Sequence, residues 1–241
     1  MIYFIGAGPG AVDLITVRGA KILGDADMII YAGSLVNPEI IRTYARSDCE
    51  IFDSAAMTLE EISAKLIEAH RKNLVTVRLH SGDPALFGAI REQIEILDKN
   101  KIPFEIIPGV SSLFAASAAL KTEYTIPEAV QTLVISRVGG RTPAPDDEFS
   151  VALFLSAGMI ERACKTLILR GFSNDAPAAV VYKASWPDEK IIRGTLATLP
   201  ELTKEAGINK TALILAGKFL DEDIKATSKL YDKNFSHEFR K

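Results

Sequence analysis

The chain contains few of the residues from which disulfide frameworks, metal sites and nucleophilic active sites are built. Among its 241 residues are two cysteines, Cys49 and Cys164, and three histidines, all widely spaced. This spacing gives neither a disulfide framework nor a ligand set for zinc or iron. Neither the Gly-x-Ser-x-Gly elbow of hydrolases nor the Gly-x-x-x-x-Gly-Lys-Ser/Thr phosphate loop occurs. The sequence therefore predicts no protein-bound metal and gives no support to a hydrolase or a kinase.

An excess of positive charge and long apolar runs are also absent. Lysine and arginine number 28 against 31 acidic residues, a net charge of −3, which argues against a nucleic-acid or anionic-membrane partner. No apolar run approaches the roughly 20 residues that span a bilayer. The N-terminus has no charged segment followed by an apolar stretch, as a signal peptide would have. Together with the sparse cysteines, these features predict a cytoplasmic protein.

The first half of the chain alternates regularly between strand-like and helix-like segments. Thr58 and Glu61 form the pair of a capping box. Asn37 precedes a proline, and Asp83 is expected to cap a helix that begins at Pro84. Such alternation predicts a parallel sheet with helices on its faces. The expected strands are Ile2–Ile5, Met28–Tyr31, Glu50–Phe52, Leu74–Leu79 and Phe104–Ile107.

After about residue 120 the strands become denser and the pattern changes. We expect an α/β fold of two domains with a cleft between them. Residues 1–120 would hold a mainly parallel sheet, and residues 121–241 a mixed sheet followed by a polar C-terminal tail. The second domain's expected strands and helices are Val130–Ser136, Val151–Leu155, Met159–Leu169, Ala178–Tyr182, Ile191–Gly194, Leu199–Ala206 and Thr211–Leu215.

A glycine-rich loop, residues 6–10, follows the first expected strand. With Ala11 it fits Gly-x-Gly-x-x-Ala, a weak dinucleotide fingerprint. A dinucleotide site needs backbone N–H groups and an acid after the second strand. Pro9 removes one N–H, and residues 31–33 are Tyr-Ala-Gly with no acid. The dinucleotide interpretation is therefore disfavoured, and a nucleotide-binding oxidoreductase stays an alternative.

The loops at residues 31–36 and 80–84 are expected at the same edge of the sheet. His80-Ser81-Gly82-Asp83-Pro84 follows the fourth strand, and Pro108-Gly109-Val110-Ser111-Ser112 follows the fifth. In a parallel sheet, ligands bind beyond the carboxyl ends of the strands. The serines either cap the helix expected at Phe114–Leu120 or hold a ligand's carboxylate or ribose. Special loops gathered on one edge favour a binding site.

Arg137 and Arg141 stand in a flexible turn that contains two glycines. Three acidic residues follow directly, so the turn is either a solvated loop or a site for carboxylates, which arginine binds bidentately. The spacing alone leaves both interpretations open.

Taken together, four motifs resemble the tetrapyrrole methylase family. They occur in matching order as Gly6–Gly10 with Asp13, Ser81–Pro84, Pro108–Ser112 and Ala184–Glu189. The resemblance, from about residue 1 to 220, implies S-adenosylmethionine (SAM)-dependent methyltransferases with two α/β domains, usually homodimeric. The resemblance is more specific in three stretches, residues 31–36, 78–84 and 131–143. These stretches resemble the family members that methylate C-11 of precorrin-4, with or without cobalt, in cobalamin synthesis. Phe87 stands where that branch is expected to have tyrosine.

The resemblance also implies where the ligands bind. SAM would lie in the cleft, and the carboxylate-rich tetrapyrrole would lie beside it. The implied SAM contacts are Pro9, Gly82, Asp83, Leu86, Ser111 and Ser112 from the first domain, with Leu155, Ala184, Ala212 and Leu213 from the second. The residues expected in the tetrapyrrole wall are Ser34, Arg137, Arg141 and Thr142.

Methyl transfer from a sulfonium needs no protein nucleophile, so the expected tasks of the enzyme are positioning and exclusion of water. His80 is the candidate general base, with a structural hydrogen bond as the alternative role. Three rival functions stay open. One is methylation of another ring carbon or of uroporphyrinogen III. The others are a protein or ribosomal-RNA methylase of the same fold, and the oxidoreductase.

Overall fold

The computed structural model describes residues 1–139, 148–221 and 236, which fold into two compact units. The first unit holds Met1–Ala116 together with Lys183–Glu189. The second holds Ser117–Tyr182 and the described residues from Lys190 onward. The sequence placed a domain boundary at residue 120, whereas the units divide inside α5 (Ser112–Leu120). Nothing in the sequence indicated that the short segment Lys183–Glu189 would pack with the first unit.

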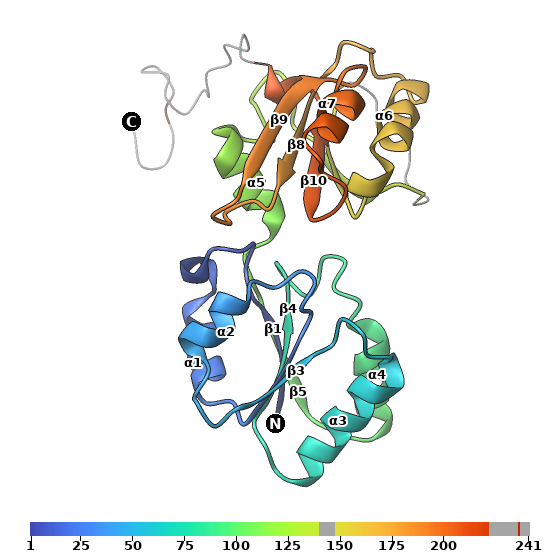
Figure 1. The fold of residues 1–241 in the computed structure, drawn as a ribbon. Helices are drawn as coiled ribbons and strands as arrows, with labels where there is room; N and C mark the ends of the chain where they lie inside the picture. The colour runs from blue at the N-terminus through green and yellow to red at the C-terminus, as the bar shows by residue number, and fades with distance from the viewer. Residues whose placement is uncertain (140–147, 222–235, 237–241) are drawn as a thin grey trace. The chain divides into compact units, whose positions relative to one another are not determined.

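The sheet of the first unit has five strands, all parallel (Figure 1). Its spatial order is β3-β2-β4-β1-β5. Every strand expected in this half is present, which confirms the parallel α/β prediction. The bounds are β1 Ile2–Gly6, β2 Met28–Tyr31, β3 Glu50–Asp53, β4 Thr76–His80 and β5 Phe104–Ile107.

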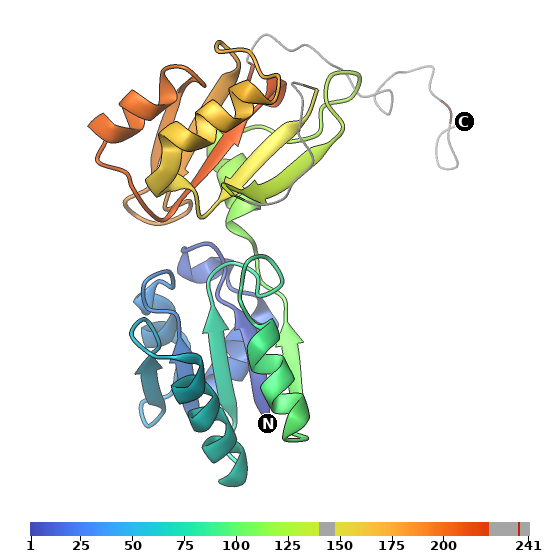
Figure 2. The same cartoon turned by 90° about the vertical axis from the view of Figure 1, so that its right-hand side faces the viewer.

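Helices cover both faces of this sheet (Figure 1; Figure 2). On one face α1 (Val17–Gly24) and α2 (Pro38–Tyr44) pack, and on the other α3 (Leu59–Arg71) and α4 (Arg91–Lys99). The neighbouring strands β1 and β4 therefore send their connections to opposite faces. Such a reversal opens a crevice at the carboxyl ends of the two strands, where ligands of open α/β sheets bind.

Two of the three expected helix starts are confirmed. The capping box of Thr58 and Glu61 is fully formed at α3, and Asn37 caps α2 by accepting from the N–H of Glu39. The helix expected to begin at Pro84, with Leu86 inside it, is wrong, because α4 begins only at Arg91.

The chain between Asp83 and α4 turns too sharply to continue as a helix. Phe87 and Ala89 both have positive φ, at 57° and 49°, in a region that helices of L-residues do not use. A Cβ on Gly88 would lie 2.1 Å from the carbonyl oxygen of Pro84. This tight turn keeps residues 84–90 as a loop on the carboxyl edge.

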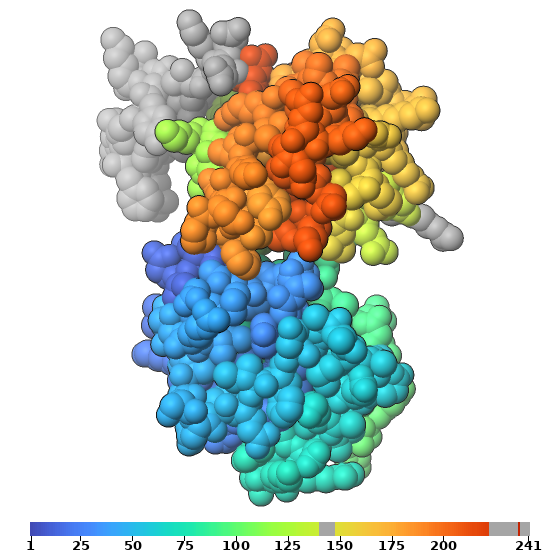
Figure 3. All heavy atoms as spheres, viewed as in Figure 1, coloured from blue at the N-terminus to red at the C-terminus, as the bar shows by residue number. Residues whose placement is uncertain are grey.

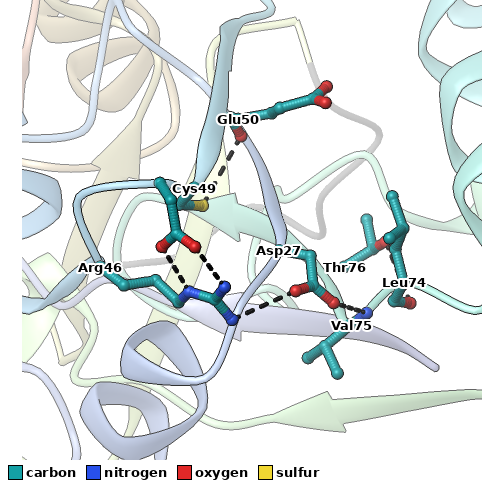
Figure 4. Close-up of polar contacts among 8 residues, drawn as sticks. Asp27, Arg46, Cys49, Glu50, Leu74, Val75 and Thr76 are labelled. Carbon is teal, nitrogen blue, oxygen red and sulfur yellow. Dashed lines mark hydrogen bonds and ion pairs between the residues drawn. The ribbon is translucent and has the colours of Figure 1, made fainter.

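At the edge where the strands of the same sheet begin, a cluster of polar contacts links neighbouring strand ends (Figure 4). Asp27 accepts from the N–H of Val75 at 2.8 Å and from the Arg46 guanidinium at 3.2 Å. The two carboxylate oxygens of Asp48 accept from Arg46 at 2.7 and 2.6 Å, which lowers the pKa of Asp48 to about 2. This exposed cluster joins the ends of three strands by contacts within the chain itself.

The second unit contains a mixed sheet, as expected. Its order is β6-β7-β10-β8-β9, with β6 parallel to β7 and every other pair antiparallel. The bounds are β6 Leu133–Arg137, β7 Ser150–Phe154, β8 Pro177–Tyr182, β9 Lys190–Thr195 and β10 Ala212–Ala216. β6 begins three residues later than expected, because Val130 pairs back with Ile126 in a tight turn.

Two helices, α6 (Ile160–Leu169) and α7 (Leu199–Glu205), pack on this sheet over a core that includes Val180 and Ile214. In the space-filling view, orange residues that include those of β9 and α7 lie on the face of this unit toward the viewer (Figure 3). Short turns of 3₁₀ helix lie at Val12–Leu14, Ala157–Met159 and Lys218–Leu220. None of the helices in the described ranges has the length and apolarity that a bilayer-spanning segment needs.

Candidate active site

At the carboxyl edge of the first sheet, the loops after β1 and β4 are joined backbone to backbone. The N–H of Ala7 donates to the carbonyl of His80 at 2.7 Å. Gly8 and Gly82 exchange two further bonds, at 3.2 and 2.8 Å. These bonds occupy the N–H groups that a pyrophosphate would need, and Pro9 has none to offer. The loop is therefore built to hold its neighbours rather than a phosphate group.

A third loop, after β5, closes onto the same point. A Cβ on Gly6 would lie 2.5 Å from the carbonyl oxygen of Gly82 and 2.6 Å from the Cα of Gly109. A Cβ on Gly109 would lie 2.1 Å from that same oxygen. Real Cβ atoms do not approach backbone so closely, so glycine at these positions allows three loops to meet.

Asp83 fastens the loop after β4 to the loop after β5. One carboxylate oxygen accepts from the N–H of Ala85 at 2.8 Å, and the other accepts from the N–H of Gly109 at 2.9 Å. Bonds to an ionised acceptor are stronger than neutral ones. Asp83 is thus a brace between two loops and not the helix cap that the sequence predicted.

Two side chains that the sequence did not predict for the site extend this network to the loops after β2 and β3. Asn37, buried at the start of α2, donates from Nδ2 to the carbonyl of Gly10 at 2.9 Å. Asp53 accepts from the N–H of Gly33 at 3.1 Å, beside Ser34. The Asn-Pro pair indicated only a cap, and no pattern in the sequence pointed to Asp53.

The segment Lys183–Glu189 supplies the last contacts of this edge. Ser185 Oγ accepts from the N–H of Ala11 at 2.9 Å, and Trp186 Nε1 donates to the carbonyl of Pro9 at 2.9 Å. Ala184, which the resemblance assigned to the second domain, is buried in this segment and belongs to the first unit.

His80 lies at the end of β4 with only 5% of its surface exposed. Its ring stacks on Phe4 with centroids 6.0 Å apart, and its Nε2 atom is buried without a hydrogen-bond partner among the described residues. Burial, with a smaller contribution from the nearby Arg78 cation, lowers its pKa to about 3. A base this weak abstracts protons poorly at neutral pH, so the structure favours a packing role for His80.

Six of the SAM candidates from the sequence gather on this edge. Ser111 caps α5 by accepting from the N–H of Leu113 at 3.2 Å. A Cβ on Gly82 would lie 3.7 Å from both the Cα of Ser111 and the N atom of Ser112, so Gly82 leaves free space beside the start of α5. The six residues are Pro9, Gly82, Asp83, Leu86, Ser111 and Ser112. The exposed Ser34 lies on the loop after β2, at the same edge.

In the second unit, strand register places three candidates at one end of the sheet. Arg137 ends β6 opposite Phe154. Leu155 follows β7, and the pairing of Ile214 with Leu153 brings Ala212 level with it. The Leu155 side chain is 57% exposed at a φ of +52°, an unusual state for a leucine. The buried Leu213 follows Ala212 in β10, whereas Arg141 and Thr142 lie outside the described residues.

Comparison with known families identifies the family of the chain. The sequence profile of the tetrapyrrole (corrin/porphyrin) methylases matches residues 1–200. The chain belongs to the tetrapyrrole methylases. Methyltransferases of this family use SAM as the methyl donor.

Relatives of this tetrapyrrole methylase match along its whole length. A cobalt-precorrin-4 C(11)-methyltransferase of Methanocaldococcus jannaschii is 51% identical over 249 residues, covering 100% of this chain and 96% of the relative. One of the same name from Priestia megaterium is 46% identical, with 100% and 97% covered. A precorrin-4 C(11)-methyltransferase of a Sinorhizobium species is 41% identical, with 99% and 98% covered.

Solved structures agree with these relatives. The X-ray structure of a cobalt-precorrin-4 methyltransferase superposes on this tetrapyrrole methylase with a TM-score of 0.85 at 44% identity, covering 91% of this chain and 95% of the other. A uroporphyrin-III C-methyltransferase from Thermus thermophilus, complexed with S-adenosylhomocysteine, gives a TM-score of 0.75 at 25% identity, covering 91% and 98%. The predicted fold, of two α/β sheets with one parallel and one mixed, is thus confirmed.

Proposed function

We propose that the chain transfers a methyl group from SAM to C-11 of cobalt-precorrin-4. The observation that carries this proposal is the end-to-end match to two relatives named for that reaction, at 51% and 46% identity. Relatives named for metal-free precorrin-4 match at 39–41%. The higher identity to the cobalt-named relatives favours the cobalt-loaded substrate.

The carboxyl edge of the first sheet has a donor set that fits SAM. The start of α5, with Ser111 and Ser112, offers N–H groups and hydroxyls of the kind that bind a carboxylate. Beside it, Gly82 leaves space that a side chain would fill. The partly exposed Leu86 adds apolar surface, and we propose that these residues hold SAM together with Pro9 and Asp83. From the rest of the chain we propose Leu155, Ala184, Ala212 and Leu213.

When bound, SAM supplies both the methyl group and the leaving group. The chain's own residues then have to position two ligands and exclude water. Positioning alone can contribute roughly 7–11 kcal/mol to lowering a barrier. The hydrogen bonds of Gly8, Asp83 and Gly10 make such positioning possible, because they link each loop to at least one neighbouring loop or helix.

For the tetrapyrrole we propose Ser34, Arg137, Arg141 and Thr142. The support is chemical, because the macrocycle is rich in carboxylates and arginine binds carboxylates in a planar, bidentate manner. Arg137 is exposed at the end of β6, in keeping with contact to a ligand.

A product analysis tests the proposed function. Purified protein is incubated with SAM and, separately, with cobalt-precorrin-4, metal-free precorrin-4 and uroporphyrinogen III. We expect the gain of one methyl group, located at C-11 by NMR, with the cobalt substrate reacting fastest. Faster turnover of the metal-free substrate would refute the cobalt assignment, and methylation only of uroporphyrinogen III or another carbon would refute the C-11 assignment.

We also propose that the protein is a cytoplasmic homodimer without a nucleic-acid or membrane partner. The support is the family resemblance, together with a net charge of −3. Light scattering of the purified chain, with a dimer mass expected, tests the oligomeric state. Fractionation of the source cells, with the enzyme expected in the cytosol, tests the location.

A further inference from the structure

The indole of Trp186 lies directly against the glycine loop after β1. A Cβ added to Gly10 would fall 1.9 Å from Trp186 Cδ1 and 2.1 Å from its Nε1, so glycine is what allows this approach. The same Nε1 donates to the carbonyl of Pro9, and Ser185 Oγ accepts from the N–H of Ala11. The consecutive loop residues Pro9, Gly10 and Ala11 therefore all contact the segment Lys183–Glu189. Ala11 and its partner Ser185 are 174 positions apart in the chain.

The segment that carries Trp186 is itself held in shape. Its tight turn is closed by a bond from the Trp186 N–H to the carbonyl of Lys183 at 2.9 Å. The N–H of Ser185 donates to a carboxylate oxygen of Glu189 at 2.7 Å, and Lys183 pairs with Asp188 at 2.6 Å. The Lys183 ammonium also lies 4.9 Å from the centre of the indole ring, close enough for a cation–π attraction. The indole is thus presented to the loop by a preorganised turn.

Ala7 and Gly8 are bonded to the loop after β4, whereas Pro9 and Gly10 have fewer contacts of their own. Pro9 has no N–H, and the glycines beside it have no side chains with which to pack. On its far side, only Asn37 is seen to reach the carbonyl of Gly10 among the described residues. The carbonyl of Pro9 accepts from Trp186, and Ala184, two residues before Trp186, belongs to the same segment. Pro9 and Ala184 are both proposed SAM contacts.

We propose that Trp186 is a positioning residue for the methyl donor: through the Pro9 carbonyl and the surface of Gly10, it fixes the loop against which SAM binds. This inference rests on the proposed function. It assigns Trp186 a role through Pro9 and Gly10 and not a part in the chemistry. Trp186 is also the only tryptophan of the chain, so its emission reports directly on this contact.

The test measures S-adenosylhomocysteine binding by calorimetry in the full-length protein with Trp186→Phe and Trp186→Ala. Phe keeps an aromatic ring over Gly10 but loses the N–H, and one lost hydrogen bond should raise Kd about 3–10-fold. Ala loses both contacts and should raise Kd further. In turnover, KM for SAM should rise in the same order, while KM for the tetrapyrrole stays within about twofold of wild type. Asp98→Asn is the matched control, because Asp98 is an exposed acid of the same unit that lies outside both the turn and the loop, and its Kd should stay within about twofold of wild type.

A second arm approaches the contact from the loop. Gly10→Ala places a methyl group where the indole lies, so in the wild-type background it should weaken S-adenosylhomocysteine binding strongly. In the Trp186→Ala background that space is free and only the strain of an alanine at the φ of Gly10, +157°, remains, so the added loss should be smaller than in the wild-type background. This non-additivity is a signature of direct contact that a general loss of stability does not give.

The outcomes separate the two proposals. If wild-type protein binds no S-adenosylhomocysteine, the proposed function fails. If it binds, and both Trp186 variants bind equally well, the proposed function stands and the role of Trp186 is refuted. If Trp186→Ala does not fold, Trp186→Phe and the control decide the question.

Discussion

Removing the carboxylate of Asp83 should loosen the crevice without unfolding the protein. Asp83→Ala deletes two hydrogen bonds at once, the local one from Ala85 and the one from Gly109 that crosses between loops. Asp83→Asn keeps one carbonyl oxygen, so it can preserve only one of the two. The ordering wild type, Asn, Ala is therefore expected both for stability and for affinity toward the methyl donor.

The size of the effect follows from those two bonds. A hydrogen bond to a charged group contributes about 1.5–3 kcal/mol, but Asp83 is partly exposed, and about 0.5–1.5 kcal/mol for each bond is the better range. Loss of both then costs about 1–3 kcal/mol. Since 1 kcal/mol shifts Tm by about 2–4 °C in a domain of this size class, Asp83→Ala should melt about 2–12 °C lower, and Asp83→Asn should lose about half as much.

The assay is thermal unfolding followed by tryptophan fluorescence, because the single tryptophan, Trp186, belongs to the first unit. S-adenosylhomocysteine titration at a temperature where each variant is folded measures affinity separately. Asp98→Ala is the control, an exposed acid of the same unit, and should change the free energy of unfolding by no more than about 0.5 kcal/mol. If Asp83→Ala melts with the wild type and binds the ligand equally well, the brace between the two loops has no energetic importance and the reasoning is refuted.

Three further perturbations test other parts of the first and second units. Because burial lowers the pKa of His80 from 6.5 to about 3 on folding, protons favour the unfolded state between those values. The free energy of unfolding should fall below pH 6.5 by up to about 1.4 kcal/mol per pH unit, and His80→Asn should flatten this fall in urea titrations at pH 7, 6 and 5. Gly109→Ala would press a Cβ to 2.1 Å from a carbonyl oxygen and should abolish soluble expression or lower Tm sharply, whereas Gly24→Ala, with its nearest contact at 3.6 Å, should leave Tm within a few degrees of wild type. Arg137→Ala should raise Kd for the tetrapyrrole by about tenfold and leave S-adenosylhomocysteine binding unchanged in paired calorimetric titrations, and equal tetrapyrrole affinity would contradict it.

Local pattern was sufficient to predict the sheets. Buried parallel strands appear in sequence as short apolar runs, and amphipathic helices between them have the 3.6-residue period, so strands such as β1 and β5 could be recognised directly. The capping pair at Thr58 and Glu61 is equally local, and it was predicted correctly. At Asp83 the same kind of signal failed, since an aspartate before a proline suits an isolated turn as well as a helix start. Only the positive φ at Phe87 and Ala89 distinguishes the two.

The site was predicted as a set of loops but not as a network. Motif positions identified the loops that contain Gly8, Gly82 and Ser111, because glycines and serines after buried strands are visible in sequence. The bonds between loops depend on tertiary register, so neither the link from Asn37 to Gly10 nor that from Asp53 to Gly33 has a sequence signal. The return of Lys183–Glu189 to the first unit is invisible for the same reason, although the motif that contains it was found.

The glycines of residues 6–10 have a different physical purpose from the one their pattern suggests. In a dinucleotide loop, glycine brings free N–H groups close to a phosphate. Here the N–H groups of Ala7 and Gly8 already donate to the loop after β4, and the carbonyls of Pro9 and Gly10 accept from Trp186 and Asn37. Because its N–H groups are already bonded, this loop has little with which to bind an anion. It presents to a ligand a backbone surface that its neighbours hold in place. That suits the in-line approach of a sulfonium methyl group to a macrocyclic carbon, in which rate depends on how closely and rigidly the two partners are held.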